Sequence, residues 1–282
     1  AAGKVVVVAG FQGVSEQTKE ITTLGRGGSD TSAVALAHAL GAVRCEILKD
    51  VPGVMTADPK RVPGARRLER LGYDELLRIA DAGCGVVHRR AVEYARTHDV
   101  PLFVGSSFAP GPGTTVTAAA PPPLPPAAEF APLAHTVAEA QGRLVLGSLA
   151  PAPHPGLPTL ARRAAAATPL TAEWLARGDR WYWEGWGSAA ALGPGATDAL
   201  ALAESEPETV MAHWEDTVGV ITLAGRRPES WCGALQKLGE LLAAGELADA
   251  PLRTDGEGVR ILVPAGQLTP LARTLHHRLL AG

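Results

Sequence analysis

Between residues 4 and 116, short apolar runs alternate with stretches whose apolar positions recur at helical spacing. The apolar runs predict strands at 4–9, 44–48 and 101–106. The periodic stretches predict helices at 29–41, 74–82 and 89–98. Strands that alternate with helices in this way indicate an α/β fold with a mainly parallel sheet. Because ligands bind beyond the carboxyl ends of the strands in such sheets, we expect Phe11, the loop 25–30 and Asp50 to lie along one rim.

The pattern changes after residue 117. Five prolines between 118 and 126 favour an extended connector, and so we expect a proline-rich linker at 118–132, with a docking peptide as the alternative. Beyond it, strand-like runs are predicted at 143–150, 217–224 and 258–263, and helices at 157–167, 229–244 and 269–280. If 180–186 is a strand, Trp181 and Trp183 share one face of it. Such a face fills a core or a subunit interface, or it forms the wall of a ligand site.

Composition narrows the function classes. The 282 residues, 46% of them hydrophobic, suffice for two domains with packed cores. The net charge of −3 argues against nucleic acid as the main partner, and no run approaches the roughly 18 apolar residues of a membrane span. Cys45, Cys84 and Cys232 are scattered and lie outside metal-ligand spacing. We therefore expect a cytoplasmic protein that carries no metal cage and that binds neither nucleic acid nor membranes.

The segment Gly25-Arg26-Gly27-Gly28-Ser29-Asp30 combines three glycines with charged and polar side chains just before a predicted helix. Glycines permit positive φ and a close approach of backbone to ligand, and a helix start attracts anions. Arg26 offers a planar fork for a carboxylate or phosphate, and Ser29 and Asp30 can cap the helix or bind a ligand. The spacing matches neither the dinucleotide fingerprint nor the P-loop. The segment predicts a site for a small anionic molecule, and a merely tight connection is the alternative.

Longer segments carry a more specific signal. They are residues 8–13, 21–31, 50–54, 56–59, 73–76 and 91–95. In residue identity, order and spacing, they resemble the aspartate kinases of the amino-acid-kinase superfamily. The alternation of predicted strands and helices in the second half resembles the paired ACT domains of that family. The resemblance implies the C-terminal half of an amino-acid-kinase domain at 1–117 and an α+β, tandem ACT-like regulatory region at 133–282. The family's N-terminal Lys-Phe-Gly-Gly segment has no match here, and so we expect an incomplete chain.

The resemblance implies an enzyme that transfers the γ-phosphoryl group of ATP, with Mg²⁺, to the side-chain carboxylate of L-aspartate. This is the first step toward lysine, threonine and methionine. On the substrate side, Arg26 would hold the α-carboxylate, and Asp30 would meet the ammonium and orient a catalytic lysine contributed by the missing half of the kinase domain. Arg26 and Asp30 are therefore the expected catalytic residues. The Ser29 hydroxyl and the Phe11 backbone would complete the aspartate site. Asp30 can also be explained as a helix N-cap.

The resemblance also implies a nucleotide side, formed by Lys49, Asp50, Met55 and Lys60. Asp50 would bind nucleotide hydroxyls, Met55 would pack against adenine, and Lys60 would take the place of a basic residue near the phosphates. Asp50 can equally be a turn residue, and Lys60 a solvated charge. Three departures from the family pattern lie here: Lys49 stands where Thr is usual, Met55 where Tyr is common, and Gly85 replaces a lysine associated with the ATP phosphates.

Two other functions stay open at this point. Gly85 and the unmatched N-terminal segment favour a catalytically inactive, kinase-like regulatory or amino-acid-binding subunit. A kinase that acts on another amino acid or on carbamate is the second alternative. For regulation, the resemblance implies lysine or threonine as an effector and a homodimer that pairs through the ACT-like domains.

Overall fold

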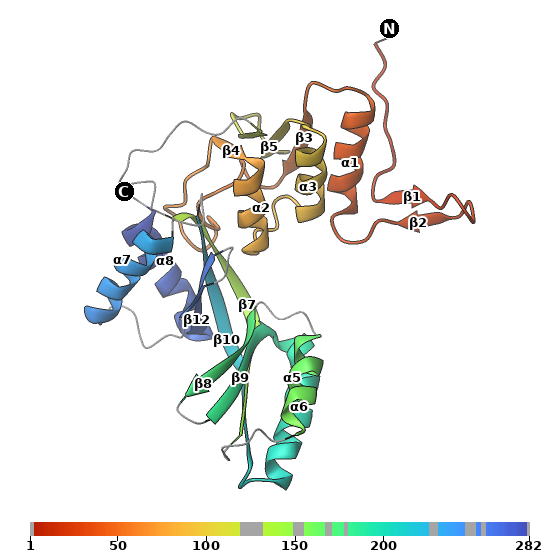
Figure 1. Cartoon of the computed structure of the whole chain (residues 1–282). Helices are drawn as coiled ribbons and strands as arrows, with labels where there is room; N and C mark the ends of the chain where they lie inside the picture. Colours follow the sequence, from red (N-terminus) through yellow and green to blue (C-terminus); the bar gives the residue numbers. More distant parts are fainter. Residues whose placement is uncertain are drawn as a thin grey trace.

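The computed structural model describes residues 3–118, 132–148, 155–166, 171–177, 180–225, 231–245, 252–254 and 258–280 (Figure 1). Residues 119–131, which make up nearly all of the predicted linker, lie outside the described residues. Within the described parts, no helix combines the length and apolarity that crossing a bilayer requires.

The first part of the chain forms a four-stranded sheet with three helices. The sheet has the order β3 (Cys45–Lys49), β5 (Leu102–Ser106), β6 (Thr114–Thr117) and β4 (Arg70–Gly72). β3 pairs with β5 and β4 with β6 in parallel, whereas β5 and β6 are antiparallel. The helices are α1 (Gly28–Ala39), α2 (Tyr73–Asp81) and α3 (Arg89–Thr97). The mixed α/β fold with parallel strands is confirmed, and the predicted helices and the strands at 44–48 and 101–106 form within a few residues of their expected bounds.

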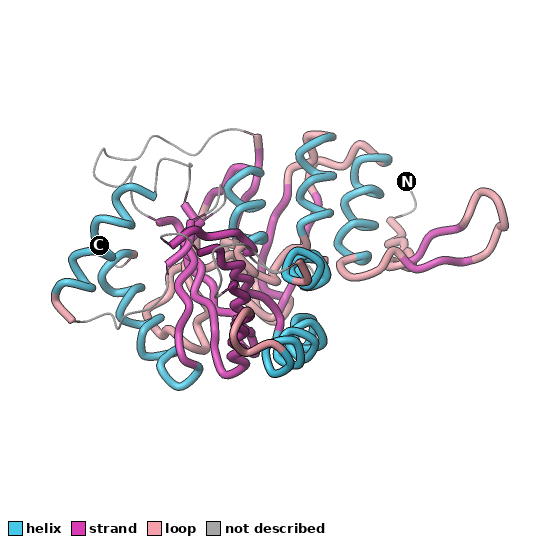
Figure 2. Tube along the Cα trace, turned by 60° about the horizontal axis from the view of Figure 1, so that its bottom comes forward, coloured by secondary structure: helices cyan, strands magenta, loops and turns pink. Residues whose placement is uncertain are grey.

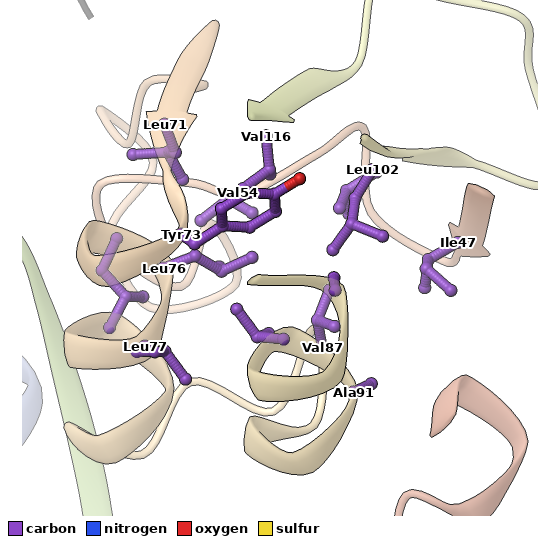
Figure 3. Packing of buried hydrophobic residues seen from close by; sticks show 14 of the residues in the cluster. Ile47, Val54, Leu71, Tyr73, Leu76, Leu77, Val87, Ala91, Leu102 and Val116 are labelled. Carbon is purple, nitrogen blue, oxygen red and sulfur yellow. The ribbon is translucent and has the colours of Figure 1, made fainter. Parts of the chain in front are cut away.

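A single apolar core joins this sheet to its helices. Leu71, Leu102 and Val116 of the sheet pack against Leu76 of α2, and each is at most 1% exposed (Figure 3). The ring of Tyr73 lies in the same core, and its hydroxyl donates a hydrogen bond to the carbonyl oxygen of Val100 at 2.8 Å. Burial raises the pKa of this hydroxyl to about 12, so that it stays a donor. The core fixes α2 and α3 on the sheet that carries the candidate site.

The expected buried strand at 4–9 is wrong. Residues 4–9 belong to no strand, and Val5 and Val7 are 92% and 93% exposed. The chain then forms a hairpin of β1 (Gln12–Val14) and β2 (Ile21–Thr23), which the sequence did not predict. A run of valines satisfies the local preference for extended backbone, but a strand also needs a neighbour for its hydrogen bonds. No described strand pairs with residues 4–9.

The second part is built on a six-stranded antiparallel sheet. Its order is β11 (Leu252–Thr254), β12 (Gly258–Pro264), β10 (Val210–Gly225), β7 (Pro132–Ser148), β9 (Arg180–Ser188) and β8 (Thr171–Arg177). The two central strands are much longer than the predicted 143–150 and 217–224, because β7 and β10 pair along nearly their full lengths. β8 was not predicted. In Figure 2 these strands lie side by side, with helices on both sides of them.

In the described residues of this part, four helices cover the two ends of the sheet. They are α5 (Leu157–Ala165), α6 (Ala189–Ser205), α7 (Trp231–Ala243) and α8 (Leu268–Leu279), with a 3₁₀ turn at Ala265–Gln267. α5 and α6 share a core with Trp183 and the start of β10, whereas α7 and α8 share a core with the end of β10 and with β12 (Figure 1). Trp183 is buried and lies in the core formed with α5 and α6, which is the core outcome expected for its strand face, whereas the Trp181 side chain lies outside the described residues. Trp186 is buried as well. The domain limits at 117, 132 and 282 stay a prediction.

The last helix also contacts the first part of the chain. Ala57 and Val62 lie in one apolar cluster with Leu275 and Leu279 of α8. The Thr56 hydroxyl and the imidazole Nε2 of His276 share a buried hydrogen bond of 2.9 Å. The segment 54–68, which α8 thus supports, forms one side of the cavity described below.

Candidate functional site

The glycine-rich loop turns tightly between β2 and α1. Gly25 and Gly27 have φ values of 76° and 75°, and the N–H of Gly28 donates to the carbonyl oxygen of Gly25 at 2.9 Å. A Cβ on Gly27 would lie 2.0 Å from the ring of His88. Both the backbone conformation and the packing therefore require glycine at position 27. α1 begins at Gly28, which directs its first N–H groups toward this loop.

Arg26 and Ser29 are exposed on this loop, whereas Asp30 is buried. Within the described part of the chain, Arg26 makes no hydrogen bond or ion pair, and so its guanidinium is free to meet a ligand. Phe11 lies beside the loop with a φ of 68° and is 45% exposed. Its carbonyl oxygen accepts from Leu24 and its N–H donates to Ser32, so that the backbone that was expected to bind substrate already has protein partners.

Asp30 joins the loop to two other segments. Its carboxylate oxygens lie 2.9 and 3.2 Å from the ammonium of Lys49, at the end of β3. The backbone N–H of His88, just before α3, donates to the same carboxylate at 3.2 Å. Neither partner is an N–H of α1, and the N-cap of that helix is Gly27 without a side-chain cap. Asp30 therefore acts as a bridge between segments, and the helix-cap explanation of this residue does not hold.

Next to this bridge lies a cavity of about 300 Å³. It is lined by Lys49, Asp50, Val51, Met55, Ala57, Asp58, Pro59, Ile79, Gly83, Cys84, Gly85, Val86 and Ala134. Three of the four residues expected on the nucleotide side thus lie together, around a space of the size that small molecules occupy. Lys60 is the exception: its side chain is 78% exposed, and its ammonium approaches the cavity only through Asp50, at 3.7 Å.

Sequence reasoning missed part of this lining. Asp58 precedes Pro59, a combination that favours a turn, and it does form one, since its carboxylate accepts from the N–H of Lys60 at 2.9 Å. It also lines the cavity, as do Cys84 and Gly85. The signal was present, because Asp58 lies within the motif at 56–59 and Cys84 precedes Gly85, which was already expected on the nucleotide side. Burial raises the pKa of the Cys84 thiol, which keeps it protonated and unreactive.

The arrangement suits the joining of two anions. An exposed guanidinium and a helix start belong to the glycine-rich loop, and the Lys49 ammonium pairs with Asp30 of that loop while Lys49 itself lines the cavity. Positive charge at such a junction favours a reaction that brings two negatively charged molecules together. Within the described ranges, no group of three His, Cys, Asp or Glu side chains is arranged to hold a metal ion.

Comparison with known proteins finds similarity to the amino acid kinase family and to aspartokinases. Residues 1–106 match the model of the amino acid kinase family. The chain is 35% identical over 280 residues to an aspartokinase of Mycolicibacterium smegmatis, over 97% of this chain and 65% of that protein. It is 57% identical over 114 residues to the aspartokinase of Corynebacterium efficiens, over 40% of this chain and 27% of that protein. The chain thus spans between 27% and 65% of the length of these two curated relatives.

Solved structures agree with this relationship. Escherichia coli aspartokinase III in complex with aspartate and ADP has a TM-score of 0.67 and 26% identity, over 96% of this chain and 59% of that one. The same enzyme in complex with lysine and aspartate matches with a TM-score of 0.67 and 27% identity, over the same shares of the two chains. Clostridium acetobutylicum aspartate kinase, at 16% identity and a TM-score of 0.73, shares the fold over 96% of this chain and 62% of its own.

Proposed function

We propose that this chain is part of an amino acid kinase related to the aspartokinases, and that its protein phosphorylates the side chain of L-aspartate with ATP. An oxygen of the aspartate carboxylate forms a bond to the γ-phosphorus, and the bond from that phosphorus to the β,γ-bridging oxygen breaks. The products are 4-phospho-L-aspartate and ADP. The carboxylate is already ionised at neutral pH, so the reaction needs positioning and positive charge rather than a general base. The observation that carries the proposal is the glycine-rich loop bridged to the cavity through Asp30 and Lys49.

The loop supplies the aspartate subsite. Arg26 pairs with the α-carboxylate through two parallel hydrogen bonds, which its exposed guanidinium can form without breaking a contact of the described chain. Asp30 attracts the α-ammonium, and the exposed Ser29 hydroxyl assists. Phe11 borders the subsite with its ring, because a ring carbon of Phe11 lies only 3.0 Å from a Cβ placed on Gly28. E. coli aspartokinase III, which has been solved with aspartate and ADP, supports this division into two subsites.

The cavity supplies the nucleotide subsite. Asp50 at its edge accepts hydrogen bonds from nucleotide hydroxyls, and the Met55 side chain packs against the base. Lys60 lies beyond Asp50 and adds positive charge at longer range. Mg²⁺ would accompany ATP and would supply positive charge to its phosphates.

The proposal also includes regulation by an amino acid and assembly into a homodimer. One of the E. coli aspartokinase III structures holds lysine together with aspartate, which supports lysine as an effector here, with threonine as the other candidate. The ACT-like region at 133–282 is the proposed site of that effector and of homodimer pairing, in a cytoplasmic enzyme. Kinship with aspartokinases over 97% of the chain supports an enzyme rather than an inactive subunit.

Arg26→Ala in the full-length protein tests the proposal. We expect kcat/KM for aspartate to fall by roughly 10- to 100-fold, since a charge-assisted bidentate contact is lost, whereas the KM for ATP changes by less than about twofold. Arg163→Ala is the matched control, because Arg163 is an exposed arginine on α5 that pairs with Asp198. Coupled ADP release measures both constants. Equal losses for aspartate and ATP would refute the role of Arg26, and absence of aspartate-dependent turnover in the wild type would refute the function.

A further inference from the structure

We propose that Lys49 supplies the positive charge that holds the terminal phosphates of the nucleotide, in place of the lysine that the family resemblance implies at position 85. The inference rests on the proposed function, because it concerns the ATP subsite of that reaction. It assigns one residue of this chain to the junction where the phosphoryl group changes partners.

The charges of the cavity single out Lys49. Among the described residues that line it, Lys49 is the only cation, and Asp50 and Asp58 are both acidic. A cavity with this lining would repel a polyphosphate if Lys49 were absent. Lys60 cannot take over this role from its present position, because it is 78% exposed and its ammonium pairs with Asp50 at 3.7 Å.

The position of Lys49 fits the transfer of a phosphoryl group. Lys49 ends β3 and lies opposite Ser106 of β5, at the carboxyl edge of these two parallel strands. Its ammonium is 2.9 Å from Asp30 of the aspartate subsite, while the residue itself lines the cavity. The side chain is 30% exposed, so that an incoming phosphate can reach the ammonium. A cation at this junction stabilises negative charge on the transferring group.

Gly85 leaves open space in the same cavity. It lines the same cavity, and a Cβ placed on it meets no atom within 4 Å, so the space for a longer side chain remains open. The segment Cys84-Gly85-Val86-Val87-His88 resembles a family segment with lysine at this place, and Lys49 stands where the family usually has threonine. These two departures from the pattern, both at the same cavity, together remove a positive charge at position 85 and add one at position 49. A shift of that charge from position 85 to position 49 explains both.

Asp30 acts as a positioning residue in this arrangement. Its carboxylate is fixed by the N–H of His88 at 3.2 Å, and it in turn fixes the ammonium of Lys49. An ammonium has three donors, so Lys49 can keep its bond to Asp30 and donate to a phosphate oxygen at the same time. Asp30 and Lys49 thereby link occupation of the nucleotide subsite to the geometry of the aspartate subsite.

The test compares nucleotide binding in the full-length protein with K49T, G85K and the double variant K49T/G85K. Calorimetry with Mg²⁺ measures the affinity for a non-hydrolysable ATP analogue and for adenosine. We expect K49T to weaken the ATP analogue by about tenfold or more, as for the loss of one charge-assisted hydrogen bond, and to leave adenosine within about twofold. The double variant should recover most of the lost affinity, because lysine at position 85 returns the charge to the cavity. Recovery by a second substitution also excludes misfolding as the cause of the loss.

Lys237→Thr is the matched control, since Lys237 is exposed on α7 and the charge change is the same. The proposal is overturned if K49T weakens ATP and adenosine equally, if K49T/G85K stays as weak as K49T, or if Lys60→Thr costs more ATP affinity than K49T. A wild type that binds neither nucleotide refutes the proposed function instead. A wild type that binds ATP and a K49T variant that binds it equally well refute only the role of Lys49.

Discussion

Thr56→Val is expected to destabilise the protein by about 1.5–3 kcal/mol, although valine has nearly the same shape as threonine. Thr56 is 5% exposed and His276 is 2% exposed, and their hydrogen bond of 2.9 Å joins the segment 54–68 to α8. The Thr56 hydroxyl oxygen also accepts from the backbone N–H of Arg66 at 2.9 Å. The substitution leaves both partners without this oxygen and adds no cavity.

The magnitude follows from the burial of those partners. The buried ring nitrogen of His276 loses its hydrogen bond to Thr56, and an unsatisfied buried polar group costs about 1–3 kcal/mol. Arg66 lies at the surface, where water can replace the lost acceptor, and so its N–H adds only about 0–1 kcal/mol. Because residues 55 and 57–59 line the cavity, T56V should also weaken nucleotide binding.

Urea unfolding followed by circular dichroism measures the effect. Thr115→Val is the control, because Thr115 is exposed on β6 and the chemical change is the same; its effect should stay within about 0.5 kcal/mol. His276→Leu completes a double-mutant cycle, in which T56V/H276L should cost about 1 kcal/mol less than the sum of the single variants. A T56V variant as stable as T115V, or a cycle that is additive, would show that the contact does not hold α8 against this segment.

Two further predictions concern His276 of α8 and Gly27 of the glycine-rich loop. Burial, followed by the charge of Arg66, lowers the pKa of His276 below its ordinary 6.5, so the folded state binds this proton less readily than the unfolded state. Stability should therefore fall as the pH drops below about 6.5, and thermal unfolding of His276→Gln should show a weaker acid dependence than that of the wild type. Gly27→Ala should lower the unfolding free energy by at least about 1 kcal/mol and abolish aspartate binding, because φ is 75° and the Cβ would meet the His88 ring. Gly239→Ala, in the open middle of α7, should leave stability unchanged or raise it; similar melting temperatures for the two variants would contradict this account of the loop.

Local sequence was sufficient for the elements whose pattern is complete within one segment. The apolar periodicity of α2 and α3 predicted both helices, and the same reasoning predicted α7, α8 and β12 within a few residues. The glycine-rich motif predicted a tight turn before a helix, and φ values of 76° and 75° at Gly25 and Gly27 match it. These features depend on neighbours a few residues away, which a sequence pattern records directly.

Other features depended on partners far along the chain. Residues 4–9 have the composition of a strand but pair with no described strand, whereas β7 and β10 extend well beyond their apolar runs because they pair with each other. α6 contains Pro194 between two glycines, a local signal for a turn, and packing of its apolar face against the sheet overrides that signal. β5 and β6 pair in antiparallel fashion, which the alternation of strands and helices did not indicate.

In the candidate site, too, some features follow from local sequence and others depend on partners far along the chain. The sequence by itself determined which residue types are present: a guanidinium and a carboxylate in the loop 25–30, and the residues Lys49, Asp50 and Met55 that line one cavity. Only the tertiary structure decided that Lys49 pairs with Asp30 across 19 residues and that His276 supports Thr56 across 220. Hydrogen bonds and ion pairs act over about 3 Å in space whatever the separation in sequence, and so folding alone brings such groups together.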